Sequence, residues 1–86
     1  MSHIVVDMNN PTPPYEQVRR EIIEQVRTGE LKPGDKLPAI RVLAGDLGLA
    51  AGTVARAYKL LEESQIVLTR RGAGTLVRAE TASLPG

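Results

Sequence analysis

The segment IRVLAGDLGLAAGTVARAYKLLEESQ, residues 40–65, is the most informative about the fold, because it carries two apolar stripes of helical period with a short break between them. The first stripe predicts a helix that begins near residue 38 or 39 and ends at Gly48, and it consists of Ile40, Leu43, Ala44 and Leu47. The second predicts a helix over about 51–65, and it consists of Val54, Ala57, Tyr58 and Leu61. Two helices joined by a tight, glycine-containing turn form a helix-turn-helix.

A further helix is predicted upstream, from Tyr15 to Gly29, entered through Pro13 and Pro14 with Thr12 as its cap. The segment LKPGDKLP, residues 31–38, predicts a turn with a very short strand at 35–37. Residues 1–12 combine a β-branched run with asparagine and proline, a composition that favours an edge strand or a weakly ordered, flexible arm.

The segment IVLTRRGAGTLVR, residues 66–78, predicts two short strands around a glycine-containing turn with a basic tip. The order helix, helix, helix, strand, strand is that of a winged helix-turn-helix. We therefore expect a mainly α fold with a small β-hairpin: three helices plus a two- to three-stranded wing over residues 13–78. Residues 79–86 are predicted to be a polar tail.

Composition limits what else the chain does. Its 86 residues contain no cysteine and one histidine, His3, which has no neighbouring residue at ligand or general-acid spacing. We therefore expect that the chain is not an enzyme and that it binds neither a metal nor a cofactor. No apolar run approaches the roughly 18 residues of a membrane span, and a cytoplasmic protein without a membrane partner is expected. The net charge of +1 is divided unevenly: residues 1–37 hold five basic and six acidic side chains, and residues 38–86 hold six and four.

The outward face of the predicted third helix has the pattern of a recognition helix. At 100° per residue, the positions opposite the apolar stripe are Gly52, Ala55, Arg56, Lys59 and Glu63. Small residues let such a helix approach the floor of the major groove, while the two cations can donate to guanine or to phosphates, and the hydroxyl of Thr53 can bond a phosphate. The helix alone is equally compatible with an ordinary solvated face.

The basic hairpin that follows the third helix favours DNA binding over a solvated face. It carries Arg70 and Arg71, and a wing of this kind reaches phosphates or the minor groove.

At this point the sequence resembles the GntR family of bacterial transcription regulators, through the segments PPYEQVRREIIEQVRTGELKPGDKLP, IRVLAGDLGLAAGTVARAYKLLEESQIV and TRRGAGTLV. Within that family it is more similar to the YtrA-type subgroup. The resemblance implies that Arg41 contacts DNA from the second helix, that the start of the third helix enters the major groove and that residues 71–74 form the wing tip. Combined with the reasoning above, the predicted DNA-binding residues are Arg41, Gly52, Thr53, Ala55, Arg56, Lys59, Arg70, Arg71, Gly72, Ala73, Gly74 and Thr75.

The chain departs from the family pattern where alanine replaces a usual polar or basic residue, and each departure removes a potential DNA contact. These positions are Ala39, Ala50, Ala51 and Ala73. Family members carry a carboxy-terminal domain that binds an effector and dimerises, whereas only about eight residues follow the wing here, so we expect that the effector domain is absent. We therefore expect weaker binding, close to that of a single module.

The expected function is sequence-specific binding of double-stranded DNA, at a palindromic operator, by a transcription regulator that acts as a repressor, with a weak homodimer possible and the effector unknown. Two alternatives remain at this point. One is a winged helix that docks on another protein. The other is the reader domain of a MocR-type regulator, whose remainder would resemble an aminotransferase.

Overall fold

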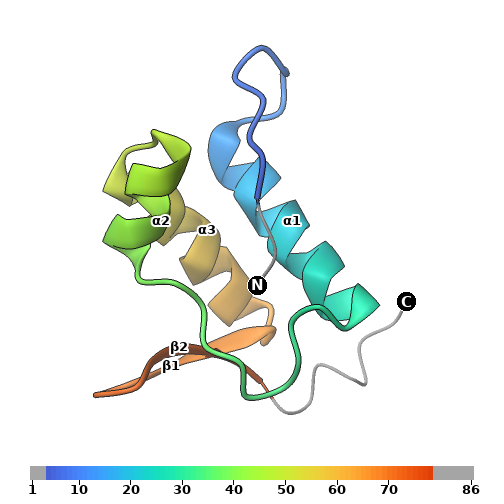
Figure 1. Ribbon diagram of the computed structural model, residues 1–86, viewed down its shortest axis with the longest axis vertical. Coiled ribbons are helices and arrows are strands. Elements are labelled where there is room, and N and C mark those ends of the chain that lie inside the picture. Colours follow the sequence, from blue (N-terminus) through green and yellow to red (C-terminus); the bar gives the residue numbers. More distant parts are fainter. Residues whose placement is uncertain (1–3, 79–86) are drawn as a thin grey trace.

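The computed structural model describes residues 4–78, and it contains three helices followed by one hairpin (Figure 1). The elements are α1 (Pro14–Thr28), α2 (Ile40–Leu47), α3 (Ala51–Glu63), β1 (Val67–Arg70) and β2 (Gly74–Val77). Helix α3 packs against both α1 and α2, and the hairpin lies across the end of α3. This is the predicted winged helix-turn-helix. Among the described residues, no helix has the length and apolarity required to cross a membrane.

The amino-terminal segment was predicted to be an edge strand or a flexible arm. Residues 4–12 form no strand, and Ile4 is buried at 2% exposure within the main core. The segment is tied to α1 by Gln17, whose side-chain oxygen accepts from the backbone N–H of Asp7 (2.8 Å) and whose side-chain nitrogen donates to the Asp7 carbonyl (2.9 Å). The buried side chain of Ile4 and the two hydrogen bonds between Asp7 and Gln17 thus hold this segment against the rest of the domain. The predicted tail, residues 79–86, lies outside the described residues.

Helix α1 begins without the side-chain cap predicted from Thr12. Its cap position is Pro13, which makes no side-chain bond to the first turn, and Pro14 occupies the first helical position. The carbonyl of Thr12 instead accepts from the Gln17 side chain (2.9 Å). Proline has no N–H to satisfy at this position and its φ already suits a helix, so the prolines themselves start α1. The helix ends where predicted, at Gly29, whose φ of 86° is left-handed.

The turn between α2 and α3 depends on Gly48, which has a φ of 68° and closes α2 at the predicted residue. The four residues of the predicted α3 stripe are all buried, so the helical period identified the inner face correctly. The Tyr58 hydroxyl donates to the carbonyl of Pro38 at 2.7 Å and so joins α3 to the entry of α2. Burial of this side chain raises the pKa of Tyr58 to about 12.

Helix α3 ends at Glu63, two residues before the predicted end. Gln65 adopts a left-handed φ of 63°, which glycine usually occupies. The N–H of Gln65 donates to the Glu62 carbonyl (3.0 Å), and the N–H of Ile66 donates to the Leu61 carbonyl (3.0 Å). This is a Schellman closure, completed by two buried side chains, Leu61 and Ile66. The chain turns here because Ile66 enters the core, although no glycine marks the turn in the sequence.

Strands β1 and β2 pair antiparallel, with Val67 opposite Val77 and Arg70 opposite Gly74. The predicted short strand at 35–37 is present as a single bridge that places Lys36 opposite Leu76. The hairpin is therefore two-stranded, with one further extended segment along β2.

The core lies where α1, α2, α3 and the hairpin meet. It is aliphatic apart from the ring of Tyr58, and its buried apolar residues are Ile4, Val18, Ile22, Leu31, Leu37, Leu43, Ala44, Val54, Ala57, Tyr58, Leu61, Ile66, Val67 and Val77. Packing of this kind fixes the positions of α3 and the wing relative to each other.

Candidate nucleic-acid interface

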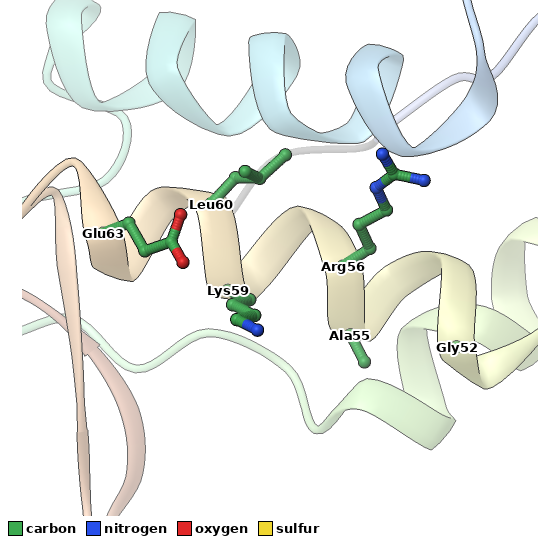
Figure 2. A pocket seen from close by; sticks show the side chains of 6 residues that line it. All are labelled: Gly52, Ala55, Arg56, Lys59, Leu60 and Glu63. Atoms are coloured by element: carbon green, nitrogen blue, oxygen red, sulfur yellow. The ribbon is translucent and has the colours of Figure 1, made fainter.

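The outward face of α3 is formed by small residues at its start and by charged residues further along. Gly52 is exposed and Ala55 is half-buried, and with Lys59 they line an open hollow on this face (Figure 2). The remaining lining residues are Arg56, Leu60 and Glu63. The small side chains leave the backbone of the first two turns accessible, as the sequence predicted for a helix that enters a groove.

Arg56 and Lys59, predicted to share this face, point in different directions. Figure 2 shows the guanidinium of Arg56 directed toward α1, where its central carbon lies 4.1 Å from the centre of the Tyr15 ring. An arginine over an aromatic ring at an exposed site contributes about 0.5–1 kcal/mol. Arg56 therefore lies at the α1 edge of the face, held by a partner that helical spacing could not reveal.

We expect the double variant Arg56→Ala, Tyr15→Leu to be less destabilised than the sum of its two single variants. The difference should be about 0.5–1 kcal/mol in the free energy of unfolding, because each single change already removes the whole cation–π contact. Urea denaturation of the four proteins measures this coupling. Strict additivity would show that the contact contributes nothing in solution.

A second hollow lies on the other side of α3, between this helix, the start of α2 and the hairpin. Its lining includes Ile40 of α2, Lys59 of α3 and two threonines of the strands, Thr69 and Thr75. Ala55 and Lys59 line both hollows, so they lie at the middle of the exposed face of α3. Arg41 follows Ile40 at the beginning of α2 and is exposed. Thr53 is half-buried in the first turn of α3.

The wing tip is a tight turn closed by the N–H of Ala73, which donates to the carbonyl of Arg70 at 3.1 Å. Gly72 and Gly74 have φ values of 85° and 84°, a conformation that an L side chain rarely adopts. Arg70 and Arg71 are exposed beside them. The tip and α2 lie on the same side of the molecule, at the left in Figure 1.

The cations on this side of the molecule differ from those of α1 in whether an acidic side chain of the protein pairs with them. On α1 the cations are paired: Arg19 and Arg20 contact Glu16 at 2.6 and 2.9 Å, and Arg27 contacts Glu24 at 3.3 Å. The hydrogen bonds from these arginines lower the pKa of Glu16 to about 2. Within residues 4–78, by contrast, no ion pair shorter than 4.0 Å is formed by the five cations predicted to bind DNA, namely Arg41, Arg56, Lys59, Arg70 and Arg71.

Two charged residues of this region were not predicted as site residues. Glu62 accepts from the backbone N–H of Thr69 at 3.2 Å and so links α3 to β1. Lys36 lies beside Gly74 of the wing, brought there by the bridge to β2. The short strand predicted at residues 35–37 was the only sequence signal for the second contact, and no local pattern indicated the first.

The comparisons with known proteins agree with this architecture. Residues 14–77 match the family described as bacterial regulatory proteins, gntR family. The chain is 50% identical over 72 residues to the HTH-type transcriptional regulator Rv1152 of Mycobacterium tuberculosis, covering 84% of this chain and 60% of that protein. It is 41% identical over 85 residues to the HTH-type transcriptional repressor YtrA of Bacillus subtilis, covering 96% and 65%. The chain thus spans 60–65% of the length of these two relatives.

Solved structures show the same fold. YtrA from Sulfolobus acidocaldarius, a GntR-family transcription factor, superposes with a TM-score of 0.84 at 42% identity, over 90% of this chain and 81% of that one. The DNA-binding domain of AraR in complex with operator ORX1 superposes with a TM-score of 0.78 at 27% identity, over 90% and 99%. The fold and the family match define a winged helix-turn-helix domain of a transcription regulator. The chain belongs to the GntR family, as its sequence predicted. Two of the similar proteins described above are named YtrA.

Proposed function

We propose that this chain binds duplex DNA in a sequence-specific manner, with α3 in the major groove and the wing at the minor groove. The observation that carries the proposal is the contrast in charge neutralisation: acids pair with the arginines of α1, whereas the cations of α2, α3 and the wing are left for an external anion. The similar AraR domain, in complex with its operator, supports the same use of the fold.

The geometry suggests distinct roles for the site residues. Lys59, at the middle of the α3 face, is placed for base edges, and Gly52, Thr53 and Ala55 allow the close approach of the helix. Arg56, beside Tyr15, suits a phosphate at the edge of the groove. The remaining predicted residues contact the backbone or the minor groove: Arg41, Arg70, Arg71, Gly72, Ala73, Gly74 and Thr75.

We further propose that the regulator is a repressor that binds a palindromic operator with two copies of this domain. The repressor name of the Bacillus subtilis relative supports the first part. Helix-turn-helix proteins that bind as dimers place two recognition helices about one DNA turn apart, which accounts for the second part.

Selection of binding sites from randomised duplexes, followed by titration of the best site at several salt concentrations, tests the proposal. We expect affinity to fall steeply with salt, a single preferred half-site and two protein molecules per full site. In a matched pair of variants, Arg71→Ala should reduce the slope of log affinity against log salt by about one, and Arg20→Ala, which removes a paired cation from α1, should not. Absence of salt-dependent binding would contradict the proposal and favour a protein-docking module.

A further inference from the structure

The wing carries a third basic side chain that comes from a distant part of the sequence. Residues 34–37 run along β2 and are joined to it by three backbone hydrogen bonds: Gly34 N–H to the Val77 carbonyl (2.9 Å), Val77 N–H to the Asp35 carbonyl (2.8 Å) and Leu37 N–H to the Thr75 carbonyl (2.8 Å). The segment is therefore fixed in register against the wing.

This register decides where the Lys36 side chain goes. Lys36 lies opposite Leu76, so its side chain emerges on the face of the hairpin shared by Leu76 and Gly74, since alternate residues of a strand share a face. Its neighbour Leu37 has the opposite direction and is buried in the core at 2% exposure. Burial of Leu37 thus commits Lys36 to the outer face of the hairpin.

The absence of a side chain at Gly74 lets Lys36 reach the tip. A β-carbon at Gly74 would lie 3.0 Å from Cε of Lys36 and 3.8 Å from its Nζ, so the end of the lysine side chain lies over the glycine backbone. Gly74 is paired with Arg70 in the hairpin register, directly next to the turn. The ammonium group of Lys36 therefore lies beside the Arg70–Gly74 pair, next to the turn that carries Arg71.

No acid neutralises this ammonium group within the part of the chain that the structure describes. The adjacent carboxylate, Asp35, accepts from the backbone N–H of Lys32 at 2.8 Å and stabilises the turn. The ion pairs of residues 4–78 shorter than 4.0 Å do not include Lys36. The hairpin and its paired segment thus carry three cations, Lys36, Arg70 and Arg71, without an ion-pair partner among residues 4–78, which favours a phosphate of a nucleic-acid backbone as their ligand.

We propose that Lys36 is a DNA-backbone-binding residue of the wing, which takes one phosphate next to those contacted by Arg70 and Arg71. The proposal rests on the proposed function and extends it to a residue outside the helix-turn-helix and the hairpin. The basic surface of the wing then has three sources: Arg70 is the last residue of β1, Arg71 lies in the turn, and Lys36 belongs to the extended segment before α2.

The test compares Lys36→Gln, Lys36→Arg and Lys32→Gln in salt titrations on the selected duplex. Each phosphate neutralised contributes about 0.9 to the slope of log affinity against log salt. Lys36→Gln should lose one such contribution to the slope. Its loss of affinity for the duplex, relative to the parent protein, should therefore be about 3.5-fold greater at 50 mM than at 200 mM salt. Lys36→Arg should keep the parental slope, because it retains the charge.

Lys32→Gln is the matched control, since Lys32 is an exposed lysine of the same turn that precedes the segment paired with β2. Thermal unfolding of each variant accounts for any loss of folded protein. This proposal would be overturned if Lys36→Gln and Lys32→Gln had the same slope of log affinity against log salt while Arg71→Ala had a reduced one. That result would leave the proposed function standing. Loss of salt-dependent binding in the parent protein itself would instead contradict the proposed function.

Discussion

Replacement of Lys59 by alanine is expected to weaken binding to the preferred duplex by about 1–3 kcal/mol, roughly 5- to 150-fold, and to relax the base preference at one position of each half-site. Lys59 lines the hollows on both sides of α3, is exposed and has no ion-pair partner among residues 4–78. Its three N–H donors are therefore available to guanine O6 and N7 in the major groove.

The measurement is a second round of site selection with the variant, combined with titration of single-base-pair changes in the parental site. Relaxed preference at one position identifies Lys59 as a base-reading residue. Arg20→Ala serves as the control, because it removes a cation that Glu16 already neutralises. A uniform loss across all duplexes would contradict base reading, since a phosphate contact weakens binding without changing sequence preference.

Leu61→Ala is expected to lower the free energy of unfolding by about 2–5 kcal/mol, the range for a leucine removed from a packed core. Leu61 has 0% exposure, and its carbonyl also accepts the closing hydrogen bond from Ile66 at the end of α3. Since native domains are stable by only about 5–15 kcal/mol, this single change removes much of the stability of an 86-residue chain. The same residue fixes α3 against the core, so DNA binding should fall with the folded fraction.

Urea denaturation of the variant measures the loss, and Leu60→Ala provides the matched control. Leu60 is the adjacent leucine, half-buried at the edge of the hollow on the outward face of α3. Its replacement removes the same number of atoms but leaves no enclosed cavity, so the cost should be clearly smaller. If both variants lost equal stability, the assignment of the inner and outer faces of α3 would be wrong.

Most of the fold was predictable from local patterns. The three helices and the hairpin follow from apolar spacing, and Gly29 and Gly48 mark two helix ends correctly. The end of α3 was predicted two residues late, because a glutamine adopts the left-handed turn there and no glycine indicates it. The cap from Thr12 was wrong, because the first turn begins at two prolines and Thr12 bonds Gln17 instead.

The candidate site was predictable in position but less so in detail. Helical spacing placed Ala55 and Lys59 on the exposed face of α3, and both line the hollows there. The same spacing gave no indication that Arg56 is held by Tyr15 of α1, or that Glu62 holds the backbone of β1. These contacts join elements whose relative positions are set by packing.

The element order, the buried faces and the family could all be predicted from the amino-acid sequence, because each depends on patterns repeated within three or four residues or on a contiguous motif. Packing of the elements against one another sets which cations lie near which residues. It turned Arg56 toward α1, brought Lys36 to the wing and tied Ile4 into the core. The physical reason is that side-chain partners across a core depend on how helices and strands cross, and the period of any one element carries no information about that crossing.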